Sequence, residues 1–242
     1  MLLRCLKAEV QKCRRSPVWL AFVLLPIFPA ILGTGNYLGN IEVLDDAWYS
    51  LWSQHTLFSS MFFLPALLGV FCAWQWRLEH ADHNWNSFLT APAPVGDLYA
   101  AKLILAAVVS LLAQVCIGLL FLLSGKIVGI PGPVPPELPE WLLCGTLGGV
   151  SVCAVQLFFS LVLRAFAPPV AFGLAGGIVG LMFTAQGWGY AFPYSLLCLG
   201  MRANNPQMEL DLLPFVLSAL IYTVVFALLA LRYLKRRDIA AE

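Results

Sequence analysis

"YAAKLILAAVVSLLAQVCIGLLFLL" occupies residues 99–123, and this stretch decides the fold. Beyond Lys102, near its start, it contains no charged residue. A helix needs about 20 mostly apolar residues to cross the hydrocarbon core of a bilayer. The stretch is long enough, so it predicts a membrane-spanning helix.

The composition of the whole chain agrees with an integral membrane protein. Of the 242 residues, 60% are hydrophobic and 11% are charged, whereas soluble domains have about 45–50% apolar and about 25% charged residues. Six windows are apolar and long enough to span a bilayer: 18–35, 57–76, 99–123, 141–163, 168–187 and 212–233. We therefore predict an all-α membrane protein with one six-helix transmembrane domain at 18–233, after a segment 1–17 and before a tail 234–242.

Lysine and arginine are distributed unevenly between the two sides of this predicted domain. Six spans place both termini on the same side, and 12 of the 14 basic residues then lie on that side: Arg4, Lys7, Lys12, Arg14, Arg15, Arg77, Lys102, Arg164, Arg232, Lys235, Arg236 and Arg237. Because basic residues favour the cytoplasmic side, we expect both termini inside. The first window resembles a signal peptide, but no small-residue cleavage site follows it and five more spans do, so we interpret it as a span.

Several classes of function are disfavoured by the residues present. A net charge of +1 offers no basic patch for nucleic acid, and LLSGK at 122–126 lacks the first glycine and the Ser or Thr of a phosphate-binding loop. No acid or histidine lies in the middle of a predicted span, where coupled transporters and intramembrane enzymes need such groups. The seven cysteines are too scattered for a disulfide framework or a zinc site: Cys5, Cys13, Cys72, Cys116, Cys144, Cys153 and Cys198. We expect no catalytic residue, metal or cofactor in this chain, and an energy source outside it.

Residues 2–15, LLRCLKAEVQKCRR, are predicted to form an amphipathic helix at the cytoplasmic membrane surface. Its apolar stripe contains Leu3, Leu6, Val10 and Cys13. Its charged residues point away from that stripe, toward anionic headgroups: Arg4, Lys7, Glu9, Lys12 and Arg14. An ordinary basic anchor and a specific elbow helix both fit this pattern. The candidate elbow residues are Leu3, Leu6, Lys7, Val10, Lys12, Arg14 and Arg15.

Small residues predict close helix contacts in the fourth and fifth spans. The candidate packing glycines are Gly145, Gly149, Gly173, Gly176, Gly177 and Gly180. We favour contacts within one subunit over contacts between subunits. The stretch 188–211 is too apolar for a polar loop, and we expect it to fold back at the outer face.

The stretch RLEHADHNWNSFLTAPAP at 77–94 lies between the second and third spans, on the predicted cytoplasmic side. Its apolar residues recur at helical spacing: Leu78, Ala81, Trp85 and Phe88, with Leu89 beside them. Its polar residues would cover the remaining surface: Arg77, Glu79, His80, Asp82, His83, Asn84 and Asn86. The prolines at 92 and 94 end such a helix. The pattern predicts a short amphipathic helix parallel to the membrane.

Three interpretations of this stretch compete. A metal site or a metal-dependent intramembrane enzyme could use Glu79, His80 and His83, although no HExxH pattern is present. A solvated loop without a partner is the second interpretation. A docking helix for a cytoplasmic motor is the third, and it explains the amphipathic pattern, the missing energy source and the small soluble mass together.

The residues that support the third interpretation resemble those of type-2 ABC exporter permeases, in particular the permeases of lantibiotic-protection transporters. The likeness covers the basic N-terminus ending in KCRRSPVWL, the six spans, 77–102, and FPYSLLCLGMRANNP before the last span. The family's inner loop carries a Glu, an aromatic residue, a leucine-rich end and a Pro, with a Lys at the start of the third span. The corresponding residues here are Glu79, Trp85, Phe88, Leu89, Pro92 and Lys102. His83-Asn84 replaces the family's usual Gly-Thr.

The resemblance implies a non-catalytic subunit of a bacterial plasma-membrane exporter. Two permease subunits, identical or related, would bind two ATPase subunits, which hold ATP and Mg²⁺. Movement would pass through a coupling segment at 77–98, with Glu79, His83, Trp85, Phe88, Leu89 and Pro92 as candidate coupling residues. In the lantibiotic-protection group the cargo is an amphipathic antimicrobial peptide that is removed from the lipid bilayer. Export of another drug, lipid or ion remains an alternative.

Overall fold

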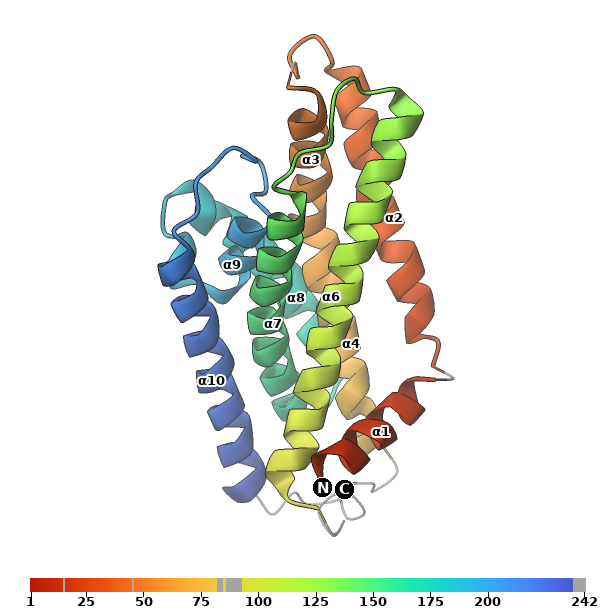
Figure 1. Cartoon of the computed structure of the whole chain (residues 1–242). Helices are drawn as coiled ribbons and strands as arrows, with labels where there is room; N and C mark the ends of the chain where they lie inside the picture. The colour runs from red at the N-terminus through yellow and green to blue at the C-terminus, as the bar shows by residue number, and fades with distance from the viewer. Residues whose placement is uncertain (15, 45, 82–84, 86–92, 237–242) are drawn as a thin grey trace.

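The computed structural model describes residues 1–14, 16–44, 46–81, 85 and 93–236. Its long helices run side by side in one bundle, and a short helix lies across the lower end (Figure 1). Six helices are long and apolar enough to cross a membrane: Val18–Gly39, Ala47–His80, Val95–Val128, Leu138–Val162, Ala167–Ala185 and Leu212–Lys235. The prediction of an all-α protein with six candidate spans is confirmed.

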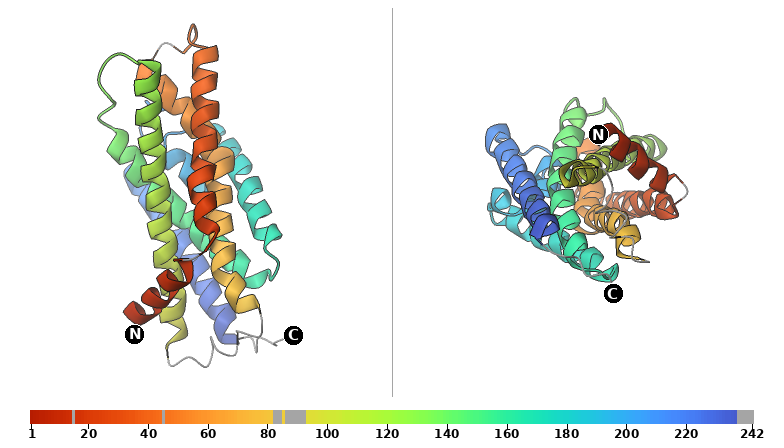
Figure 2. Two further views of the ribbon diagram at one scale, coloured as in Figure 1. Left: turned by 90° about the vertical axis from the view of Figure 1, so that its right-hand side faces the viewer. Right: turned by 90° about the horizontal axis from the view of Figure 1, so that it is seen from below.

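The helices follow one another in a simple up-and-down order. Their bounds are α1 Leu2–Cys13, α2 Val18–Gly39, α3 Ala47–Phe58, the π-helical turn η1 Ser59–Phe63, α4 Leu64–His80, α6 Val95–Val128, α7 Leu138–Val162, α8 Ala167–Ala185, the 3₁₀ turn η2 Gly189–Ala191, α9 Pro193–Gly200 and α10 Leu212–Arg236. Helix α1 packs across the lower part of α6, as both Figure 1 and Figure 2 show. The end of α4, the start of α6 and the end of α10 lie at this same end.

The second span is one continuous helix made of α3, η1 and α4, and it begins well before the predicted window 57–76. His55 therefore lies inside this helix, in its α3 part, and is buried. Its Nε2 is 2.9 Å from Thr34 Oγ1, and that hydroxyl donates to Ala30 O at 2.7 Å. Because the hydroxyl proton is already used, Thr34 accepts a hydrogen bond from His55 Nε2.

The six glycines predicted to serve helix packing all lie against other parts of this chain. Gly145 and Gly149 of α7 face side chains of α6, and the glycines of α8 face η1, α4 and α9. A Cβ on Gly173 would lie 2.7 Å from Pro65 O, and one on Gly180 would lie 2.8 Å from the backbone of Tyr194. Any side chain at these positions would push the helices apart.

The stretch between α8 and α10 folds back into the bundle. All residues of α9 are buried, among α7, α8 and α10. Arg202 follows α9 with a φ of 51°, and its guanidinium is buried. It donates to the carbonyls of Leu199 and Gly200 and pairs with Glu140 at 2.6 Å. This network closes the end of the bundle opposite α1.

Candidate functional site

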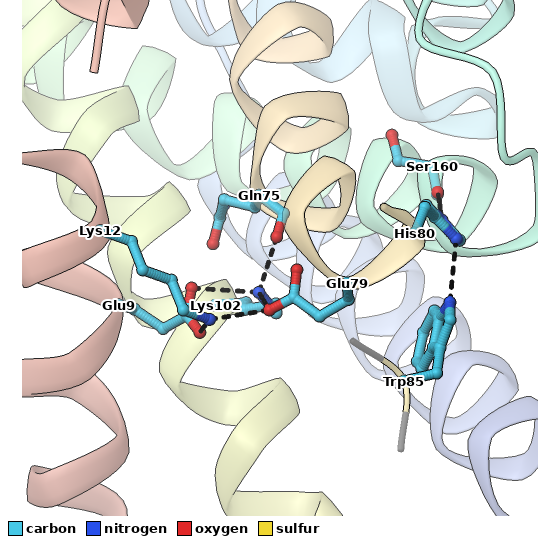
Figure 3. Close-up of polar contacts among 8 residues, drawn as sticks. All are labelled: Glu9, Lys12, Gln75, Glu79, His80, Trp85, Lys102 and Ser160. Atoms are coloured by element: carbon cyan, nitrogen blue, oxygen red, sulfur yellow. Dashed lines mark hydrogen bonds and ion pairs between the residues drawn. The ribbon is translucent and has the colours of Figure 1, made fainter. Parts of the chain in front are cut away.

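Four charged side chains meet at the α1 end of the bundle, and we call them the ion cluster: Glu9 and Lys12 of α1, Glu79 of α4 and Lys102 of α6 (Figure 3). Lys12 Nζ is 2.7 Å from Glu9 Oε1 and 2.8 Å from Glu79 Oε1. Lys102 Nζ is 3.0 Å from Glu9 Oε2 and 2.9 Å from Glu79 Oε1. The two lysines and two carboxylates balance in charge, and together they join three helices.

Lys102 lies at the centre of this cluster. Its side chain is 0% exposed, and it also donates to Gln75 O at 2.7 Å. The oxygens of Glu9, Glu79 and Gln75 thus match the three N–H groups of the Lys102 ammonium. Its Nζ lies 4.8 Å from the centroid of the Trp76 ring, which adds a cation–π contact. Lys102 therefore does not need to extend to the membrane surface, because its counter-ions lie within the bundle.

Each residue of the cluster is placed by helical geometry. Glu9 and Lys12 are three residues apart on α1, so both side chains reach the same side of that helix. Glu79 is in the last turn of α4, and Lys102 is in the second turn of α6. Removing two charges from water is costly unless the pairing is close and the remaining hydrogen-bond capacity is filled. The cluster meets that condition except at Glu79 Oε2, which has no partner among the described residues.

Lys12 remains partly accessible at the edge of the cluster. Burial disfavours its charged form, but the carboxylates of Glu79 and Glu9 outweigh burial and hold the pKa of Lys12 above its ordinary value. Its neighbour Cys13 is buried, and burial raises the pKa of that thiol to about 11. Lys12 is thus charged at neutral pH, and Cys13 is an unreactive thiol.

A second chain of contacts starts from the same helix end. Trp85 Nε1 donates to His80 Nδ1 at 3.2 Å, and His80 Nε2 is 2.9 Å from Ser160 O of α7. Trp85 is buried and stacks on Trp76, with centroids 5.8 Å apart and planes at 19°. Figure 3 shows the two sets of contacts on opposite sides of the end of α4. Trp76, which faces Lys102, lies between the two sets and makes them continuous.

The predicted amphipathic helix at 77–90 is wrong in its first part. The transmembrane helix α4 continues through Arg77 to His80, and Ala81 is extended, with φ −89° and ψ 151°. Glu79, predicted to face the cytosol, is 3% exposed. Leu78, predicted to be in the apolar stripe, is 40% exposed. The remaining coupling candidates His83, Phe88, Leu89 and Pro92 lie outside the described residues, as does Arg15 of the elbow.

Helix α1 is present as predicted, but its faces are assigned differently. Cys5, Glu9 and Cys13 are the buried line, and α1 packs with it on α6. Leu3 and Val10 are 74% and 48% exposed. They form one open surface with other elbow candidates: Leu6, Lys7 and Arg14. Glu9, predicted to point away with the other charged residues, is instead buried, because Lys102 offers it a counter-charge.

Sequence reasoning missed the role of three residues in this site. Glu9 was placed on the solvent side, His80 was considered only for metal chemistry, and Ser160 was not considered. The position of Lys102 could have indicated the role of Glu9, because a lysine within an apolar span needs an acidic partner from another segment. In the described part of the chain, no group of three or more His, Cys, Asp or Glu residues is placed to hold a metal.

Comparison with known families gives one match. Residues 5–180 match a family model described as ABC-2 family transporter protein. The matched region is more than two thirds of the chain and includes the whole ion cluster, Trp85 and His80. No curated protein sequence matches the chain.

Proposed function

The chain belongs to the ABC-2 family of transporter proteins, and from that premise we propose that it links ATP hydrolysis by an ABC ATPase to export of an amphipathic antimicrobial peptide of the lantibiotic type. The family is the membrane component of ABC transporters, so the chain is a multi-pass permease that works with an ATPase partner. The cargo, the orientation and the coupling residues are the parts that we propose.

The ion cluster carries the proposal for coupling. The stretch 81–94 is attached at one end to α4, through His80, and at the other end to α6, through Val95. The cluster connects these two helices to each other and to α1. A force applied to 81–94 by an ATPase would therefore move α1, α4 and α6 together. Trp85, held against the bundle within that stretch, is the first residue that we expect such a force to reach.

The distribution of charge supports the proposed orientation, with the α1 end in the cytoplasm of a bacterial cell. The chain order of the helices brings the predicted cytoplasmic basic residues to the α1 end and leaves Lys126 and Arg202 at the other. This asymmetry follows the positive-inside rule. An ATPase in the cytoplasm would then meet the end of the bundle that carries the ion cluster.

The surface of the bundle supports a cargo that enters from the lipid. Helix α10 carries a long exposed apolar face. An amphipathic peptide dissolved in the bilayer could reach this surface without crossing water. The resemblance to lantibiotic-protection permeases supplies the chemical class of the cargo.

Co-purification with an ABC ATPase tests the proposal. We expect the chain, expressed with the ATPase encoded beside it, to form a stable complex and to protect cells from a lantibiotic in an ATP-dependent manner. An ATPase variant that cannot hydrolyse ATP should bind but not protect. A chain that forms no complex and gives no ATP-dependent protection would contradict the proposal. Protection against a different class of compound would support the permease function but contradict the proposed cargo.

A further inference from the structure

His80 makes two hydrogen bonds that together fix its protonation state. An indole N–H can only donate and a backbone carbonyl can only accept. Trp85 Nε1 faces His80 Nδ1 at 3.2 Å, and Ser160 O faces His80 Nε2 at 2.9 Å. The imidazole must therefore carry its proton on Nε2 and a lone pair on Nδ1, which is the neutral form.

Protonation of His80 would place two N–H groups against each other. A charged imidazole donates from both nitrogens, so Nδ1 could no longer accept from Trp85. The contact to Ser160 O would remain. The change would thus act on one side of the ring only, on the side that holds Trp85.

The indole N–H of Trp85 donates to His80 inside the protein. The ring centroids of the two residues are 5.2 Å apart, at 62°, and Trp85 is 5% exposed. The stack on Trp76 holds the flat face of the indole, whereas the bond to His80 fixes its edge. Loss of this bond would leave the stack in place but allow the indole to turn.

Charged groups from three parts of the chain act on His80. They are Glu79 beside it on α4, Arg164 just after α7, and Lys102 of α6 on the other side of α4. Arg77 lines the same small hollow as His80 and Arg164. The carboxylate of Glu79 binds two lysines through Oε1, so much of its charge is already balanced.

We propose that His80 is a positioning residue for coupling, which in its neutral form fixes the edge of the Trp85 indole against the end of α4 and on protonation lets that indole turn. The inference rests on the proposed function, because Trp85 lies in the stretch that we assign to the ATPase. It adds a regulation: acidification of the cytoplasm would weaken transmission between the ATPase and the spans. Histidine is suited to this role because gain of one proton turns Nδ1 from an acceptor into a donor.

The test compares His80→Gln with the wild type in vesicles that contain the permease and its ATPase. Glutamine can accept and donate at the same time but does not titrate near neutral pH. ATP-dependent transport is measured at pH 8 and at pH 5.5, and the ratio of wild type to His80→Gln cancels the pH dependence of the ATPase. His83 is present in both proteins, so the ratio reports on His80 alone. We expect the ratio to fall at pH 5.5, by up to about fivefold, the scale of one lost hydrogen bond.

Two further variants make the test specific. His80→Ala should lose coupling at both pH values, and His80→Gln should restore part of it. Trp85→Phe keeps the stack on Trp76 but removes the N–H group, so this variant should show no acid response of its own. Trp85→Phe also tests the proposal if His80→Gln does not assemble with the ATPase.

Two different results separate this inference from the proposed function. A ratio that is equal at pH 8 and pH 5.5, or an acid response unchanged in Trp85→Phe, would overturn the role of His80 and leave the permease function intact. A wild-type complex without ATP-dependent transport at pH 8 would instead overturn the proposed function.

Discussion

Lys102 brings a positive charge into the second turn of a membrane-spanning helix, and its three N–H groups are met by Glu9, Glu79 and Gln75. Its partners Glu9 and Gln75 are 93 and 27 residues away in the sequence. Composition indicates that such a lysine needs counter-ions, but it does not say which segment provides them.

Lys102→Met should destabilise the protein strongly. The variant leaves two buried carboxylates with only Lys12 as a partner, and removing one member of a buried pair typically costs about 3–5 kcal/mol. The thermal unfolding midpoint in detergent measures this loss. Arg232→Met, at an exposed position of α10, is the matched control and should change little.

A double variant tests whether the loss arises from unbalanced charge. Glu79→Gln added to Lys102→Met removes the one carboxylate left without a matching lysine, so it should restore part of the stability. If Lys102→Met alone unfolds at the same temperature as Arg232→Met, the ion cluster does not hold this end of the bundle.

The raised pKa of Lys12 predicts a defined pH dependence. A group whose pKa is raised on folding stabilises the protein fully below its ordinary pKa of 10.5, and loses that contribution as pH rises through the folded pKa. The stability difference between wild type and Lys12→Met should therefore stay constant from about pH 7 to pH 9.5 and shrink above about pH 10.5. Thermal unfolding across this range measures it. A difference that already disappears by pH 9 would mean that Lys12 is not held by Glu9 and Glu79.

At the scale of the element, the long spans could be predicted from the sequence because only uninterrupted apolar helices satisfy their backbone groups in lipid. Which face of a short helix is buried could not be predicted from the sequence. For α1 the helix itself was predicted, but Glu9 is buried because its partner Lys102 is distant in the sequence. For α4 the turn expected after the window did not occur, and the helix continued to His80.

The glycine contacts of α8 give a prediction at this scale. Gly173→Ala places a Cβ 2.7 Å from the backbone oxygen of Pro65, which cannot rotate away, so helices α8 and α4 must separate. Overpacking of this kind costs about 1–3 kcal/mol. Gly35→Ala is the control, because nothing lies within 4 Å of its added Cβ, and alanine favours the helix. Equal thermal midpoints for the two variants would show that close approach at Gly173 is not needed.

At the scale of the whole molecule, the end of the bundle that carries α1 differs from the opposite end. It combines the ion cluster, Trp85, the contact of His80 with α7, and both ends of the stretch 81–94. The number of spans and the class of transporter could be inferred from the sequence. The arrangement of α1, α4 and α6 around one neutral cluster could not, because it depends on contacts between residues far apart in the chain.

The measurement that most directly tests the account is ATP-dependent transport by the reconstituted permease–ATPase complex, compared with ATP hydrolysis in the same vesicles. We predict that Trp85→Ala leaves the ATPase bound and hydrolysing ATP but reduces transport per ATP at least about tenfold, whereas Arg232→Ala does not. Transport per ATP equal to that of the wild type in Trp85→Ala would contradict the claim that movement passes through this end of the bundle.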